Sequence, residues 1–154
     1  MKAVYLVLIT ILFAYKPAEK VPYERDKKPM PEGQEWNVMF PPHLGEFVRI
    51  NFQPPTSTSN GLAYYKKGKQ IVFVSFKKLA DNKDIQEYMK VAKSDVMRST
   101  SETRDISVSG DLKYVLYKQN DKIFFAWNRG LYYFEVRVEG DVSVMDGFMS
   151  VFPY

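Results

Sequence analysis

Residues 110–140 read GDLKYVLYKQNDKIFFAWNRGLYYFEVRVEG, and this stretch decides the fold. It contains three aromatic-rich apolar runs, separated by two short polar breaks of the kind that punctuate strands. Breaks this short leave no room for the crossover that parallel neighbours require. The stretch therefore predicts an antiparallel meander with strands at Leu112 to Lys118, Lys122 to Trp127 and Leu131 to Val138.

The residues before the meander predict further strands and one long helix. Phe47 to Phe52 alternates between apolar and polar residues, and Leu62 to Tyr65 and Gln70 to Lys77 flank a turn that contains Gly68. Asp81 or Asn82 can accept a first-turn amide, so a helix is predicted from there to about Arg98. Its apolar stripe comprises Ile85, Tyr88, Met89, Ala92 and Val96. A short strand is also expected at Ile106 to Val108.

The end of the chain predicts a second, shorter helix. Asp141 can cap a helix from Val142 to about Val151, with Val142, Met145, Phe148, Met149 and Phe152 on one side. The predicted class is α+β, with a mainly antiparallel sheet of about six to seven strands. The long helix follows the third strand, and the short C-terminal helix packs on the sheet.

Composition bounds the class of protein. The chain has 154 residues, of which 45% are hydrophobic and 26% charged, which suits a single domain. It has no cysteine, and this excludes disulfides, thiolate catalysis and cysteine-ligated zinc. The net charge of +4 is spread along the chain, so no nucleic-acid partner is expected.

The first residues predict export. After Met1 and Lys2 comes an uncharged apolar run of thirteen residues, Ala3 to Tyr15, which is shorter than a typical membrane span of roughly 20. Residues 1–20 are therefore interpreted as a signal peptide or a short membrane anchor. Leu12 is large for a cleavage site that ends at Ala14, so cleavage and membrane orientation stay open. The predicted location is periplasmic, secreted or membrane-anchored, with the cytoplasm as the weaker alternative.

Residues 21–39 are rich in Pro, Lys and Glu and are interpreted as a linker to a single domain at 40–154. Trp36, Val38 and Phe40 alternate with polar or flexible residues, which favours a first strand at the domain edge.

Catalytic and cofactor motifs are absent from the sequence. Nucleotide-binding glycine loops, zinc and calcium spacings and a nucleophile elbow are all missing, so no cofactor or metal is expected. His43 is the only histidine, and a lone histidine needs a base, a nucleophile or a second ligand to do chemistry. Glu135 and Arg137 lie two apart on a predicted strand, and we interpret them as an ion-pair ladder in preference to a catalytic acid.

Aromatic side chains make up 16% of the chain and cluster on the predicted strands. Most are expected in the core, but Tyr117, Trp127 and Tyr133, or the opposite set, can form an apolar floor for a ligand or partner. Arg129 lies at the same turn as Trp127, and Arg and Trp are enriched among the residues that contribute most to binding at protein–protein interfaces. The densest basic patch is formed by Lys66, Lys67 and Lys69. It can bind anionic lipid or acidic polysaccharide, or it can serve only to keep the protein soluble.

Three functions are consistent with these patterns. The first is a non-catalytic exported or membrane-tethered domain that binds another envelope component through its sheet face or loop tips. The second is a carrier or sensor of a small apolar ligand held between helices and sheet, and the third is a hydrolase that uses Asp or Glu. An exposed apolar patch favours the first, an enclosed pocket the second, and converging acidic groups the third.

Overall fold

The structure is a computed structural model that describes Tyr23, residues 28–31, Gly33 and residues 35–98, 103–109, 112–119 and 121–154. Side chains at 95–98, 103–109, 112, 113, 117 and 119 are not described. The predicted leader at 1–20, and much of the predicted linker at 21–39, lie outside the described residues. No helix among those that are described is long and apolar enough to cross a membrane.

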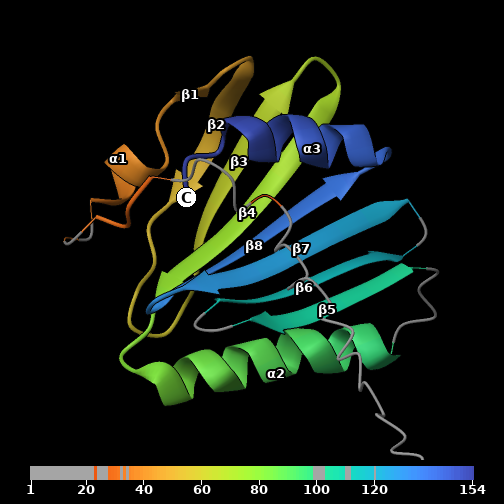
Figure 1. Ribbon diagram of the computed structural model, residues 1–154. Helices are drawn as coiled ribbons and strands as arrows, with labels where there is room; N and C mark the ends of the chain where they lie inside the picture. Colours follow the sequence, from red (N-terminus) through yellow and green to blue (C-terminus); the bar gives the residue numbers. More distant parts are fainter. Residues whose placement is uncertain are drawn as a thin grey trace, which may run out of the picture.

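One antiparallel sheet organises the domain, with strand order β1-β2-β3-β4-β8-β7-β6-β5 (Figure 1). The strands are β1 (His43–Leu44), β2 (Phe47–Gln53), β3 (Gly61–Lys67), β4 (Gln70–Lys78), β5 (Thr103–Ser109), β6 (Leu112–Gln119), β7 (Lys122–Arg129) and β8 (Tyr132–Glu139). Apart from the two-residue β1, seven strands are present, as the sequence predicts. The long helix follows β4, which is the third of these seven. The α+β prediction is thus confirmed.

Each half of the sheet is a meander, and β4 and β8 join the halves. Gly68 and Gly130 occupy turns with φ of 59° and 54°, values that favour glycine. They fix the registers of β3 with β4 and of β7 with β8. In the sequence, α2 (Asn82–Arg98) connects the first half of the sheet to the second. The carboxylate of Asp81 accepts hydrogen bonds from the amides of Lys83 and Asp84 at 2.8 and 3.0 Å, as the predicted cap requires.

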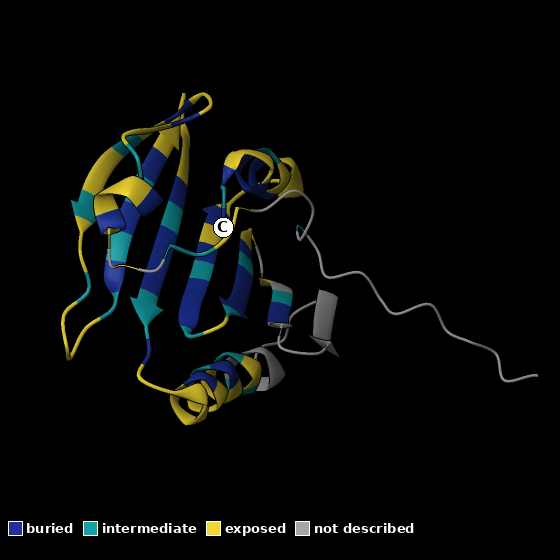
Figure 2. Ribbon diagram, turned by 60° about the vertical axis from the view of Figure 1, so that its left-hand side comes forward, coloured by how far each residue is buried: buried dark blue, intermediate teal, exposed yellow. Residues whose placement is uncertain are grey.

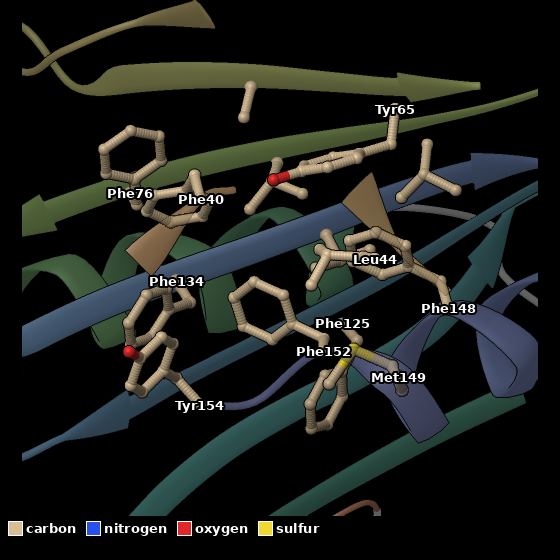
Figure 3. Packing of buried hydrophobic residues seen from close by; sticks show 14 of the residues in the cluster. Phe40, Leu44, Tyr65, Phe76, Phe125, Phe134, Phe148, Met149, Phe152 and Tyr154 are labelled. Carbon is tan, nitrogen blue, oxygen red and sulfur yellow. The ribbon is translucent and has the colours of Figure 1, made fainter. Parts of the chain in front are cut away.

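The main core lies between the sheet and α3 (Val142–Val151), which begins at the predicted cap, Asp141. Phe148 and Phe152 enter a layer of rings from the strands, where Phe152 lies 5.9 Å from Phe134 (Figure 3). The predicted stripe of α3 needs one correction. Val142 is 52% exposed and Val144 is buried in its place, because Val142 is the first helical residue and lies outside the contact with the sheet.

The second core lies on the other face of the sheet, under α2. Ile85 and Met89 of α2 are buried there against Val115, Ala126 and Tyr133 of β6 to β8. The helices α2 and α3 thus cover opposite faces of the sheet (Figure 1). Buried positions alternate with more exposed ones along β3, whereas β4, β7 and β8 each have a run of consecutive buried residues (Figure 2). Val96, which completes the predicted stripe of α2, lies outside the described side chains.

Residues before the sheet also pack on the α3 side. Trp36 lies in α1 (Trp36–Met39), a single helical turn, so the predicted strand at 36–40 is wrong. The short turn places both Trp36 and Met39 in the main core, which an extended segment with alternating faces does not do. The segment before α1 is also held: the carbonyls of Pro31 and Gly33 accept from the hydroxyl of Tyr132 at 3.0 and 3.2 Å.

The buried tyrosines on this side predict alkaline destabilisation. Burial raises the pKa of Tyr65, whose hydroxyl donates to the carbonyl of Pro41 at 3.0 Å, above its ordinary value of 10.0. The unfolded chain therefore loses this proton first, so stability is complete below pH 10 and falls as the pH rises above it. Urea unfolding between about pH 9 and pH 11 should show this loss.

A Tyr65→Phe variant is the control for the alkaline effect. It removes one ionisable group and one hydrogen bond, so we expect a loss of about 1 kcal/mol at neutral pH and a shallower decline above pH 10. An unchanged slope in the variant would show that Tyr65 does not contribute to the decline.

Candidate functional site

No helix of the described part of the chain lies over one half of the α2 side of the sheet. Because α2 packs on β6 to β8, the surface over β3, β4 and the adjoining ends of β8 and β7 remains uncovered. We call this surface the open face. Ile71 of β4 lies on the open face and is 48% exposed, and Val48 of the neighbouring β2, opposite Lys66 in register, is 43% exposed. These two exposed apolar side chains lie on either side of Lys66.

A row of aromatic residues crosses the open face perpendicular to the strands. Register places Tyr64 opposite Phe73, Phe73 opposite Arg137, and Arg137 opposite Phe124. These four residues, one from each of β3, β4, β8 and β7, form what we call the aromatic row. Directly opposed residues on neighbouring strands point to the same face, so the four side chains stand side by side.

Arg137 lies at the centre of the row between two rings. Its guanidinium carbon is 4.7 Å from the ring centroid of Phe73 and 5.3 Å from that of Phe124. Tyr64 meets Phe73 edge-on at 5.1 Å. Cation–π contacts of this kind hold a guanidinium in place while its edges remain available for hydrogen bonds.

The carboxylate of Glu135, two residues before Arg137 on β8, holds the guanidinium in place. Glu135 Oε1 accepts from Nε and Nη2 of Arg137 at 3.1 and 2.9 Å, and Oε2 accepts from the hydroxyl of Tyr133 at 3.0 Å. The predicted Glu135–Arg137 pair is thus confirmed. Nη1 of Arg137 donates to no residue in the described part of the chain, which leaves it for a ligand.

A groove of about 550 Å³ lies along the row. Three cations line it, but only one carboxylate, that of Glu139, which lies 3.6 Å from Nζ of Lys122. Within the described residues Lys69 has no carboxylate partner. The groove is therefore both apolar and cationic. It is lined by Tyr64, Lys69, Gln70, Ile71, Phe73, Lys122, Phe124, Arg137, Val138 and Glu139.

The rings of the row are poorly placed to stack on a flat ligand. Tyr64 and Arg137 approach Phe73 from neighbouring strands on its two sides, and Arg137 also covers Phe124. A nucleobase or sugar needs a free ring face. Ring edges and an Arg fork instead match the composition of protein–protein hot spots.

The chain matches no protein-family model, no curated protein and no solved structure. The geometry of the open face is therefore the basis for a functional proposal. Among the residues that the structure describes, no three His, Asp or Glu side chains gather in a group that could hold a metal ion. His43 lies exposed in β1.

The predicted floor residues are not brought together. Trp127 is 4% exposed and packs under α3, at 4.8 Å from Phe125 and 5.1 Å from Phe134. Tyr133 is equally buried, at 4%, but on the α2 face, where it meets Tyr88 at 5.1 Å. The backbone of Tyr117 pairs with Phe124, so its position extends the aromatic row, but its side chain lies outside the described residues.

Arg129 and the basic patch have separate surroundings. Nη1 of Arg129 donates to the carbonyl of Lys28 at 2.8 Å, so this side chain binds the chain's own N-terminal segment. In the patch, Lys66 and Lys69 border the open face, whereas Lys67 pairs with Glu46. Sequence reasoning named none of Tyr64, Phe73 and Phe124 as site residues, although the turns at Gly68 and Gly130 carry their register.

The space between α3 and the sheet is filled by side chains. Tyr65, Phe134, Phe148 and Met145 are each 0% exposed there. A small apolar ligand between this helix and the sheet would have to displace the core, which cores packed to crystal density resist.

Proposed function

We propose that the chain is a non-catalytic binding domain of the cell envelope that docks another envelope protein on its open face. The apolar run at 3–15 supports export or membrane tethering, as argued from the sequence. Fractionation of cells that express the chain with and without residues 3–15 tests this location. The observation that supports the binding role is the aromatic row with Arg137 at its centre, on a sheet surface that neither α2 nor α3 covers.

Charge defines the partner. In the groove Arg137 is paired with Glu135 and Lys122 lies near Glu139, so Lys69 is the cation without a carboxylate partner among the described residues, and Lys66 adds a further cation at the border. A complementary surface presents carboxylates next to apolar side chains, so that the acids meet the cations while the apolar groups cover Ile71 and the ring edges. The partner we propose is accordingly a protein with an acidic segment interrupted by apolar or aromatic residues.

A glutamate–tyrosine copolymer provides a defined test ligand for this chemistry. Fluorescence anisotropy of the labelled copolymer should show saturable binding that weakens as salt is added, since exposed charges are screened. Arg137→Glu removes the central donor and introduces repulsion, so we expect the affinity to fall at least about 30-fold, the range of a hot spot. Phe73→Ala should lower it by about tenfold or more.

Two controls make this result specific. Lys93→Glu changes the net charge equally but lies on the exposed side of α2, so it should alter the affinity by less than about twofold. Polyglutamate, which lacks rings, should bind more weakly than the copolymer. If Arg137→Glu and Lys93→Glu behave alike, binding follows net charge alone and the open face is not the docking surface.

A further inference from the structure

A second hollow lies at the far end of β4, away from the groove of the open face. It measures about 560 Å³, within the usual range for small-molecule sites of roughly 300 to 1,000 Å³. Because it wraps round the strand end, its walls come from α1, the loop at 54–60 and the first turns of α2. The lining residues are Trp36, Pro55, Thr56, Ser57, Lys77, Lys78, Leu79, Ala80, Asp84 and Tyr88.

The aromatic walls of this pocket are held by their own contacts. Trp36 lies 5.2 Å from Phe76 and 6.0 Å from Tyr132, so its indole is anchored in the main core. The hydroxyl of Tyr88 donates to Oδ1 of Asn60 at 3.1 Å, which ties α2 to the loop. The apolar walls are therefore preformed, and a ligand would not have to order them.

Two half-buried lysines line the same pocket. Nζ of Lys77 donates to the carbonyl of Ser57 at 3.3 Å, and Nζ of Lys78 lies 5.3 Å from the ring centroid of Tyr132. Neither ammonium has a carboxylate within ion-pair distance among the residues that the structure describes. Partly desolvated cations with only neutral partners gain free energy from an anion that reaches them.

The charge of the lining decides the class of ligand. Against the two lysines stands one carboxylate, Asp84, which is exposed in the first turn of α2. From this asymmetry, together with the indole and phenol walls, we propose that the pocket binds a small organic anion with an aromatic or aliphatic body. The acid group meets Lys77 and Lys78, and the body lies against Trp36 and Tyr88. This site is separate from the docking surface for an acidic protein.

Two fluorescent probes of similar shape test the assignment on the full chain. Anilinonaphthalene sulfonate carries the acid, and N-phenyl-1-naphthylamine lacks it. We expect saturable binding of the sulfonate, and an affinity that drops about tenfold in a Lys77→Gln, Lys78→Gln double variant. The neutral probe should lose less than about twofold, because it makes no charged contact.

Control variants separate this pocket from the open face. Lys83→Gln removes an exposed cation that does not line the pocket and should leave sulfonate binding unchanged. Phe73→Ala alters the open face alone and should also leave it unchanged. The proposal is overturned if the double variant binds the sulfonate as tightly as the parent, or if Phe73→Ala abolishes that binding. Thermal melting of each variant confirms that it is folded.

Discussion

Replacing Phe76 with alanine should lower the free energy of unfolding by about 3 to 5 kcal/mol, the range for a large buried ring. Phe76 is 0% exposed and lies at a junction of the main core. Its ring stacks on Phe40 at 3.8 Å and lies 5.2 Å from Trp36 and 6.0 Å from Phe52. These rings come from different segments, so they cannot all close on the cavity that the change would leave.

Phe73→Ala is the matched control, on the same strand but the opposite face. Phe73 is half-exposed in the aromatic row, so its loss should lower stability by only about 1 kcal/mol. Guanidinium unfolding, followed by circular dichroism, measures both variants. Equal losses at the two positions would mean that the open face is part of the stabilising core, which would argue against its role in docking.

Two glycine-to-alanine changes should have opposite signs. A Cβ at Gly61 would lie 2.5 Å from Cε2 of Phe76 and 2.7 Å from Cδ of Pro55, so the buried ring must move. We expect Gly61→Ala to destabilise the protein by about 1 to 3 kcal/mol, as overpacked cores do. A Cβ at Gly147, in α3, would meet nothing within 4 Å. Gly147→Ala should stabilise by about 0.5 to 1 kcal/mol.

Thermal and denaturant unfolding of the two glycine variants tests this difference. The comparison is internal, since each variant adds one methyl group and removes the same backbone freedom from the unfolded chain. A stabilising Gly61→Ala would mean that Phe76 can rotate away at little cost, and the packing around it would then be looser than the close contacts imply.

The local parts of the fold could be predicted from the sequence because their signals are local. Asp81 and Asp141 cap α2 and α3 as predicted, and Gly68 and Gly130 mark the turns that set the hairpin registers. The same registers imply that Tyr64 faces Phe73 and that Phe124 faces Arg137. The β3–β4 hairpin thus supplies two residues of the aromatic row, and the β7–β8 hairpin supplies the other two.

The pairing of the hairpins could not be predicted, because it is non-local. Nothing in the sequence states that β4 lies against β8, and this contact alone brings Phe73 beside Arg137. In β4, apolar residues occupy both faces of the strand. The alternation of apolar and polar residues therefore does not show which face α2 leaves open. Trp127 and Tyr133 share a meander, but they belong to opposite parities once the register is known. The floor predicted from them therefore divides between two cores.

Hydrogen bonds attach the segment at Lys28 to the C-terminal tail and to the β7–β8 hairpin. The amide of Lys28 donates to the carbonyl of Pro153 at 2.7 Å, and its carbonyl accepts from Arg129 at 2.8 Å. A pull on the upstream residues is therefore taken up first by the C-terminal tail, just beyond α3, and by the tip of the β7–β8 hairpin. Because Arg129 belongs to β7, which also carries Phe124 of the aromatic row, tension on the upstream residues would reach the docking side through the β7–β8 hairpin.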